Sequence, residues 1–468
     1  MPDTNRSSAP ASAPARGAPR EPASREHALA LDAADPLAPL RELFDIPPGV
    51  IYLDGNSLGV LPRATAARVQ QVVREEWGQG LIRSWNAAGW MTLASRIGDK
   101  IARLVGARPG ELVVADSTSV NLFKVLWAAL SMVRAEKSEP SPLPAARRLI
   151  VSERSNFPTD LYIAESIARE RGFELKLVDA EDIAAHLSGE AGARTAVLLL
   201  THVNYRTGAM HDMAALSRAA HEAGALAIWD LCHSAGAVPV DLHAGGADFA
   251  VGCGYKYLNG GPGAPAFVWV HPRHVERFRQ PLAGWMGHAA PFEFKPGYRP
   301  AAGIARYFCG TPAVLSLAAL ECGVDTLLAA EPVARAAGQP SAMTALRAKS
   351  LALSRLFAAR VGALCPSLTL ASPAEDARRG SQVCFSHASP HPASGYAIMQ
   401  ALIARGVIGD FRAGDPSHPP DAADILRFGF TPLYLRFVDA WDAAEQMRQV
   451  LDGEEWRRPG FNQRHAVT

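Results

Sequence analysis

Short apolar runs alternate with amphipathic stretches along most of the chain between residues 60 and 311. Seven apolar runs predict strands, most of them bounded by Gly, Pro or Asp: residues 111–115, 148–152, 174–178, 196–201, 225–230, 247–252 and 265–270. Amphipathic stretches predict helices at residues 62–77, 91–105 and 120–136. Unbroken apolar runs are typical of strands buried on both faces, so the alternation predicts an α/β fold with a mostly parallel, seven-stranded sheet between layers of helices.

The pattern changes after about residue 311. Two long helices are expected at 312–331 and 339–361, followed by strands at 368–371, 381–386 and 425–430 and a last helix at 437–452. This order is typical of a smaller α+β domain. We therefore expect a large domain over residues 61–311, a small C-terminal domain over 312–468, and an N-terminal arm over 31–60 that joins the small domain.

Residues 1–30 consist mainly of Ala, Pro, Ser and Arg, with almost no large apolar side chains. The segment lacks the apolar core of a secretory signal. Its composition resembles an Arg- and Ser-rich transit peptide, but it carries acidic residues, and its prolines would break an amphipathic helix. A disordered N-terminal tail is the preferred interpretation.

Composition excludes several classes of function. Of the 468 residues 48% are hydrophobic, enough for a large core, and 47 basic residues balance 46 acidic ones. This balance gives no electrostatic reason to expect binding of nucleic acid or of a charged membrane. The six cysteines show no CxxC pair or metal-ligand spacing, and no apolar stretch approaches the roughly 18 residues of a membrane span. We expect a cytoplasmic enzyme or binding protein without a metal.

Lys256 and Asp230 are the most informative polar residues. Each follows or ends an apolar run that predicts a buried strand. A lysine there can form a Schiff base with the aldehyde of pyridoxal 5'-phosphate (PLP), and an aspartate can keep the pyridine nitrogen of that cofactor protonated. The alternatives are a surface lysine and a carboxylate that caps the next helix.

Other polar residues also allow more than one interpretation. Thr118 and Ser119 stand where strand 111–115 turns into a helix, so they either bind a phosphate at the helix N-terminus or cap the helix. His233 either contacts Asp230 or a cofactor, or is structural. Tyr255 either packs its ring, reaches the phosphate or donates a proton near Lys256.

The segment from Asp230-Leu-Cys-His-Ser-Ala-Gly to Tyr255-Lys-Tyr-Leu-Asn resembles the aminotransferase class V group of fold-type-I PLP enzymes. Within that group the chain is similar to the bacterial kynureninases. The distinguishing pieces cover residues 50–436 in the family's order: Leu53-Asp-Gly-Asn-Ser-Leu-Gly, Asp116-Ser-Thr-Ser-Val-Asn-Leu, Phe157-Pro-Thr-Asp, His202-Val-Asn-Tyr-Arg-Thr-Gly, Leu282-Ala-Gly-Trp-Met-Gly-His, Gly310-Thr-Pro and Leu426-Arg-Phe-Gly-Phe-Thr-Pro-Leu-Tyr.

The resemblance implies a role for each matching residue. Lys256 would be the Schiff-base lysine and Asp230 the partner of the pyridine nitrogen. The phosphate would be held by Thr118, Ser119, Tyr255, Trp285 and Thr311. The last two are expected to come partly from a second subunit, which implies a homodimer. Phe157 would stack on the pyridine ring, and the rest of the cofactor site would be formed by Pro158, Thr159, Asp160, Thr201 and His233.

Substrate binding follows from the same resemblance. Arg427 would bind the substrate α-carboxylate through two parallel hydrogen bonds, although a rim arginine paired with Asp424 is the alternative without the family context. The aryl ring would lie against Trp85, Gly310 and Thr311.

The implied reaction is hydrolysis of L-kynurenine to anthranilate and L-alanine in tryptophan degradation or NAD precursor supply, with 3-hydroxykynurenine less favoured. Tyr255 is the candidate proton donor to Cβ.

Three rival functions deserve comparison. A cysteine desulfurase or selenocysteine lyase would need a histidine beside the Schiff-base lysine, where this chain has Tyr255, and a desulfurase would need a loop cysteine, for which Cys365 is the only candidate. An aminotransferase would need a keto-acid acceptor. A non-catalytic regulator would usually lose the lysine or gain a DNA-binding domain, and Lys256 is present.

Overall fold

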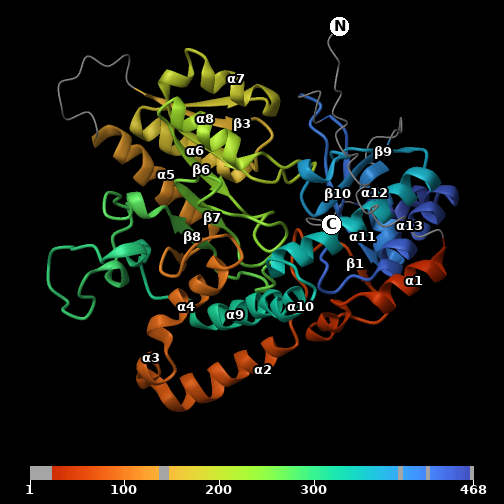
Figure 1. The fold of residues 1–468 in the computed structure, drawn as a ribbon, viewed down its shortest axis with the longest axis horizontal. Coiled ribbons are helices and arrows are strands. Elements are labelled where there is room, and N and C mark those ends of the chain that lie inside the picture. Colours follow the sequence, from red (N-terminus) through yellow and green to blue (C-terminus); the bar gives the residue numbers. More distant parts are fainter. Residues whose placement is uncertain (1–23, 136–146, 388–393, 418–421, 464–468) are drawn as a thin grey trace, which may run out of the picture.

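A seven-stranded sheet forms the centre of the larger part of the molecule (Figure 1). The computed structural model describes residues 24–135, 147–387, 394–417 and 422–463. The strand order is β2-β8-β7-β6-β5-β3-β4. The strands are β2 (Leu112–Val114), β3 (Leu149–Glu153), β4 (Glu174–Val178), β5 (Thr195–Thr201), β6 (Leu226–Asp230), β7 (Phe249–Gly252) and β8 (Phe267–Val270). All seven predicted strands are confirmed, each within two residues of its predicted ends.

The sheet is mostly parallel, as predicted. β7, β6, β5, β3 and β4 run in the same direction, whereas β8 is antiparallel to both β7 and β2. The register places Thr201 opposite Asp230 and Asp230 opposite Val251. The carboxyl ends of three neighbouring strands therefore lie level with one another, and polar side chains that follow them meet at one edge of the sheet.

Helices cover this sheet (Figure 1). α5 packs against β5, β6, β7 and β8 and against α6, while α8 packs on β6 and α7. α4 presents Leu93, Ile97 and Ile101 to the core, all at most 1% exposed. The helices of this part are α2 (Ala64–Gln71), α3 (Ser84–Ala87), α4 (Trp90–Ala102), α5 (Thr118–Ala135), α6 (Pro158–Arg171), α7 (Ile183–Ser188) and α8 (Met213–Glu222).

The predicted helix 62–77 is longer than expected. α2 continues without a break into a π-helical segment, Val72–Gly80, which ends where Leu81 adopts a positive φ of 53°. α9 (Val314–Leu328) lies against both α2 and α4. The first helix after residue 311 therefore packs on the part of the chain that carries the large sheet.

A second layer of structure follows α9. Four antiparallel strands in the order β12-β13-β10-β9 pack against the helices α11 and α12, and α13 packs on both of these helices. The strands are β9 (Leu368–Leu370), β10 (Gln382–His387), β12 (Asp410–Arg412) and β13 (Ile425–Gly429), and the helices after α9 are α10 (Glu331–Ala336), α11 (Ala342–Leu364), α12 (Ser394–Ala404) and α13 (Phe437–Asp452). The predicted α+β pattern is confirmed. Together with the large sheet it confirms the α/β fold class.

The N-terminal residues reach this second layer. β1 (Ile51–Tyr52) pairs in parallel with β11 (Val407–Ile408), and α1 (Arg25–Ala34) packs on α13. α1 begins inside the segment expected to be an irregular tail, because Ser24 caps it. Asp32 in turn accepts hydrogen bonds from the first amides of α13. The prediction of a tail up to residue 30 is wrong for residues 25–30; residues 1–23 lie outside the described residues.

Among the described helices, none combines the length and the apolar character needed to cross a membrane.

Candidate active site

Most of the residues predicted to bind the cofactor gather around one cavity at the carboxyl edge of the large sheet. Lys256 follows β7, and the cavity beside it has a volume of about 70 Å³. It is lined by Thr118, Ser119, Phe157, Thr159, Asp160, Thr201, Tyr205, Asp230, Cys232, His233, Tyr255 and Lys256. Ten of these twelve were predicted from the sequence; Tyr205 and Cys232 were not.

The Lys256 amine faces a histidine and two aromatic rings. Its Nζ lies 3.0 Å from Nε2 of His233. The rings of Phe157 and Tyr255 have their centroids 5.8 Å and 5.7 Å from the same nitrogen. Burial, and then the positive charge of Lys256, hold the pKa of His233 well below its ordinary value. The imidazole is therefore neutral at neutral pH and can accept a hydrogen bond from the ammonium of Lys256.

Two buried carboxyls line the same cavity. Asp230 ends β6 and Asp160 lies in the first turn of α6, and each is 2% exposed. Burial, reinforced by the Asp230 charge and a hydrogen bond between the two side chains, raises the pKa of Asp160 well above its ordinary value. The pair therefore holds a proton between its two carboxyls.

Asp230 does not cap a helix. Its Oδ1 accepts a hydrogen bond of 2.6 Å from the amide of Cys232, and the residues that follow form turns rather than a helix. The capping alternative for Asp230 is wrong, and its carboxyl is directed into the cavity edge.

The N-terminus of α5 lies at the same cavity. Ser117 is the residue that caps this helix, because its Oγ accepts from the amide of Val120 at 3.3 Å. Thr118 is then available to face the cavity, where its hydroxyl lies 3.6 Å from Sγ of Cys232. A helix N-terminus with hydroxyls beside it favours an anion such as a phosphate.

Tyr255 precedes Lys256 and borders the same cavity. Burial, followed by the neighbouring cysteines, raises the pKa of its phenol above the ordinary value. The phenol therefore keeps its proton throughout the neutral range. Its backbone carbonyl accepts from the amide of Gly59 at 2.8 Å, which attaches this turn to the N-terminal segment.

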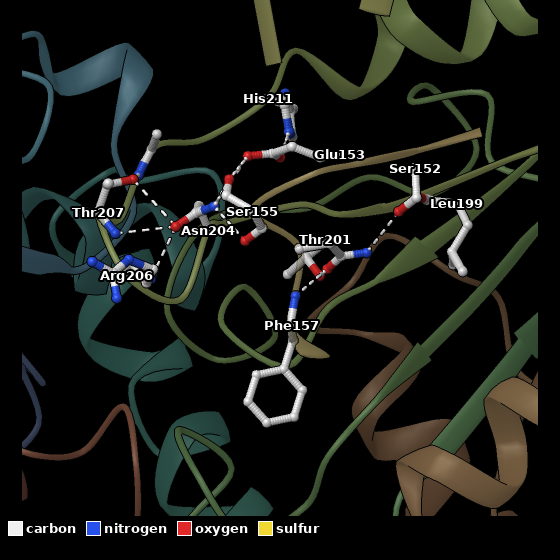
Figure 2. A network of polar contacts seen from close by, with 12 residues as sticks. Ser152, Glu153, Ser155, Phe157, Leu199, Thr201, Asn204, Arg206, Thr207 and His211 are labelled. Carbon is white, nitrogen blue, oxygen red and sulfur yellow. Dashed lines mark hydrogen bonds and ion pairs between the residues drawn. The ribbon is translucent and has the colours of Figure 1, made fainter. Parts of the chain in front are cut away.

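Phe157 is positioned by a residue that the sequence did not single out. The side-chain oxygen of Asn156 accepts from the amide of Phe157 at 2.6 Å and from the hydroxyl of Thr201 (Figure 2). Its amide nitrogen donates to Oγ of Ser152 at 3.0 Å. Phe157 is 38% exposed, an unusual state for a phenyl ring beside a core, and fits a ring that stacks on a bound group. Pro158 begins α6 directly after it.

Arg427 lies in β13, outside the cavity lining, with its side chain 1% exposed. Its guanidinium forms an ion pair with Asp410, and its Nη1 donates to the carbonyl of Tyr205 at 2.5 Å. The alternative pairing with Asp424 is wrong, because Asp424 accepts from the amide of Gly414 instead. Through Tyr205 the arginine is attached to the wall of the cavity.

The remaining predicted residues lie beyond the Lys256 cavity. Gly310 and Thr311 line a neighbouring cavity of about 470 Å³ that shares Thr118 and Tyr255 with it. Trp85 and Trp285 contact each other edge to face, with ring centroids 6.2 Å apart, and line neither cavity. A single chain therefore does not bring the two tryptophans to Lys256.

The side chains present fit PLP. An amine, a buried carboxyl pair, a phenyl ring and the hydroxyls of a helix N-terminus line one cavity. Oδ2 of Asp160 is buried and has no hydrogen-bond partner from the described residues. This donor set suits a molecule with an aldehyde, a protonated ring nitrogen and a phosphate. The described residues contain no group of three or more side chains arranged as metal ligands.

Known proteins with similar sequences are kynureninases. A kynureninase of Burkholderia pseudomallei strain 1106a is 54% identical over 449 residues, covering 95% of this chain and 100% of that protein. A kynureninase of Pseudomonas fluorescens is 53% identical over 449 residues, with the same shares covered. The family model described as the kynureninase C-terminal domain matches residues 346–447.

Solved structures show the same fold at low sequence identity. A cysteine desulfurase from Thermococcus onnurineus NA1 superposes with a TM-score of 0.69 at 19% identity, covering 89% of this chain and 98% of that one. A C-DES mutant with glycine covalently linked to its PLP cofactor superposes with a TM-score of 0.70 at 17% identity, covering 87% and 98%. This likeness concerns architecture alone and agrees with the fold-type-I prediction. Identity of 54% over nearly the whole length decides the family, and the chain belongs to the kynureninases.

Proposed function

We propose that this chain is a PLP-dependent kynureninase, which hydrolyses L-kynurenine to anthranilate and L-alanine. The observation that carries the proposal is the cluster of Lys256, Asp230, Tyr255 and His233 at one sheet edge, in a chain 54% identical to a named kynureninase. PLP, when bound, supplies the electron sink for cleavage of the bond between Cβ and the carbonyl carbon.

Each residue has a task that matches its surroundings. Lys256 binds the cofactor aldehyde through its amine and, once the substrate amine takes its place, moves the proton of the substrate Cα. Asp230 holds a proton on the pyridine nitrogen, and the buried Asp160 supports it. Tyr255 keeps its phenolic proton through the neutral range, so it donates that proton to Cβ as anthranilate leaves.

The substrate ends are bound by different parts of the chain. Arg427 binds the α-carboxylate after rearranging its contacts with Asp410 and Tyr205. Trp85, Gly310 and Thr311 contact the aryl ring. A large apolar indole with small partners matches the bacterial type of the family, which supports a preference for kynurenine over 3-hydroxykynurenine.

A homodimer completes the site in this proposal. Aromatic contacts run from Trp85 through Trp285 and Phe292 to Phe294. Phe292 and Phe294 are 59% and 79% exposed, and Ile82, near Trp85 in sequence, is 78% exposed. Large apolar side chains gathered at a surface are typical of an interface. In the dimer this surface brings Trp285 and Thr311 to the partner's phosphate site.

The decisive experiment mixes purified, PLP-loaded protein with L-kynurenine and follows anthranilate fluorescence, with 3-hydroxykynurenine alongside. Fast release of anthranilate with one alanine per turnover is expected. Bound PLP without anthranilate would move the function to transamination or to cysteine desulfuration. We place the enzyme in the cytoplasm, in tryptophan degradation or NAD precursor supply.

A further inference from the structure

Lys256 is connected to the C-terminal sheet through one histidine. Nε2 of His233 lies 3.0 Å from Nζ of Lys256, and its Nδ1 lies 2.9 Å from Oε1 of Gln382. Gln382 is the first residue of β10, 149 residues away from His233 in the chain. His233 and Gln382 are 3% and 1% exposed, so both side chains are largely shielded from bulk water.

The orientation of the Gln382 amide is fixed by its surroundings. Its Nε2 donates to the carbonyls of Tyr205 at 3.0 Å and of Asn204 at 3.3 Å. Since carbonyls only accept, the nitrogen must face them and the oxygen must face His233. The Gln382 side chain has little room to move, because the backbone of Gly208 packs closely against it. A Cβ added to Gly208 would lie only 2.8 Å from Cγ of Gln382.

An amide oxygen facing Nδ1 decides which nitrogen of His233 carries the proton. The oxygen only accepts, so Nδ1 must donate to it. A neutral imidazole with its proton on Nδ1 presents a lone pair at Nε2. That lone pair points at the amine that the proposed function makes the attachment point of PLP.

We propose that Gln382 is a positioning residue that holds His233 in its Nδ1-protonated form and so keeps a hydrogen-bond acceptor facing the Lys256 amine. The inference deepens the proposed function, because the state of this amine governs how the enzyme captures PLP. It also gives the C-terminal sheet a direct influence on the reactive lysine.

Burial, and after it the positive charges nearby, lower the pKa of His233 and keep the ring neutral. Lys256 follows β7, Arg427 lies on β13 and Arg412 on β12, and all three positive side chains oppose a proton on the imidazole. The ring of Tyr257 contacts it edge to face, with centroids 6.5 Å apart, and brings no charge of its own. Because a second proton on the His233 imidazole is disfavoured, Gln382 determines only which of the two ring nitrogens carries the single proton.

The first test reads the tautomer directly and needs neither cofactor nor activity. Histidine-selective ¹⁵N labelling of the ligand-free chain gives side-chain signals for its 14 histidines, and the His233→Asn variant identifies the signal that belongs to His233. We expect a protonated Nδ1 and an unprotonated Nε2. A proton on Nε2 would overturn the inference, whatever the outcome of the kynurenine assay.

The second test compares two variants that each remove contacts of the loop formed by residues 204–206. Gln382 contacts the loop from β10, and Arg206 belongs to it. Gln382→Met loses the oxygen facing His233. Arg206→Met is the matched control, because Arg206 donates from this loop to the carbonyls of Ala413 at 2.6 Å and Ala423 at 3.0 Å. No hydrogen bond between Arg206 and His233 is found among the described residues. The measured quantity is the pH midpoint for the appearance of the visible band of bound PLP.

Loss of the acceptor destabilises the ammonium form of Lys256, so PLP capture should begin at lower pH in Gln382→Met, by about half to one unit. Arg206→Met should keep the wild-type midpoint. Equal shifts in both variants, or no shift in Gln382→Met, would mean that Gln382 acts only by holding the loop. In the His233→Asn background, Gln382→Met should cause no further shift.

If Gln382→Met fails to fold, the wild-type spectrum still decides the inference, and a proton on Nε2 of His233 would overturn it. Absence of anthranilate release together with the expected tautomer would reject the proposed function and leave the positioning role of Gln382 in place.

Discussion

Arg427 and Asp410 form an ion pair that is almost fully withdrawn from water, with side chains 1% and 2% exposed. The two lie opposite each other on β13 and β12. Nη2 of Arg427 also donates to Ser57 at 2.9 Å, while Nη1 is taken by the carbonyl of Tyr205. Nε is buried without a partner from the described residues. A substrate carboxylate must therefore compete with Asp410 for this guanidinium.

The first prediction concerns Arg427→Lys. A lysine cannot form the two parallel hydrogen bonds of a guanidinium, so KM for kynurenine should rise by about 10- to 100-fold. The visible band of bound PLP should persist, since Arg427 does not line the Lys256 cavity. Steady-state kinetics measures both quantities.

Arg412→Lys is the control for this prediction. Arg412 lies two residues after Asp410 on β12 and pairs with the same carboxylate at 2.9 Å. Its KM should change by less than about threefold. An unchanged KM in Arg427→Lys would assign Arg427 a purely structural role and place the substrate carboxylate elsewhere.

The second prediction concerns Asp54, which lies near this ion pair. Burial, followed by the charge of Asp410, raises the pKa of Asp54 to about 7. An acid with a raised pKa in the folded state binds more protons there than in the unfolded chain. Its stabilisation is therefore present below the unfolded pKa and is lost as pH rises through the folded pKa.

Asp54→Asn mimics the protonated acid at every pH. The free energy of unfolding of the wild type, relative to this variant, should fall between about pH 4 and pH 7 by up to about 1.4 kcal/mol per pH unit. Denaturant unfolding at several pH values measures this difference. A difference that does not depend on pH would show that Asp54 titrates alike in the folded and unfolded chain.

The sequence predicted the parts of this molecule that local pattern determines. The seven strands of the large sheet are unbroken apolar runs because both faces are covered. Asp230 was placed at the functional edge because strand ends gather there. By contrast, β1 and β11 have only two residues each, too few to show any periodicity.

The positioning residues escaped prediction for a different reason. Asn156 contacts Thr201, 45 residues away, and Gln382 contacts His233, 149 residues away. Asn and Gln are common polar residues, and nothing in their own neighbourhood marks them. Their roles depend on how distant strands dock, which a single sequence read along its length does not reveal.

The third prediction concerns the two residues that the sequence marked most clearly. Lys256→Ala should lose the visible band of bound PLP and at least about 1,000-fold of turnover, because no other amine lines the cavity among the residues that the structure describes. Asp230→Ala should remain folded, as judged by circular dichroism, and lose most activity. Full turnover by Lys256→Ala, or by Asp230→Ala, would remove that residue from its proposed role.

The fourth prediction concerns Asn156→Ala. It removes the acceptor for the Phe157 amide and the Thr201 hydroxyl (Figure 2), so the ring expected to stack on PLP is less well fixed. Two lost buried hydrogen bonds should weaken PLP binding by about 10- to 30-fold, measured by equilibrium titration. Ser155→Ala is the control, because Ser155 contacts Glu153 and Asn204 in the same network. This variant should bind PLP with the affinity of the wild type. Equal losses in both variants would point to general loosening of the network.

The last prediction concerns stability at the opposite edge of the large sheet. The carboxylate of Asp248 is fully buried and accepts from the amide of Ala227 at 2.8 Å, while His221, His274 and Arg273 surround it. These hydrogen bonds outweigh burial, which opposes them, and hold the pKa of Asp248 well below its ordinary value.

Asp248→Asn leaves Arg273 without its buried counter-charge and should lower the free energy of unfolding by about 3 kcal/mol at pH 7. Asp179→Asn, in a half-exposed pair with Arg154, should cost less than about 1 kcal/mol. Because the folded pKa of Asp248 is lowered, its advantage over Asn is present above about pH 4 and shrinks as pH falls below it. PLP binding should be unaffected, since Asp248 precedes β7 and Lys256 follows it. If the free energy of unfolding fell by similar amounts in the two variants, burial would not make the contacts of Asp248 more stabilising than a half-exposed pair.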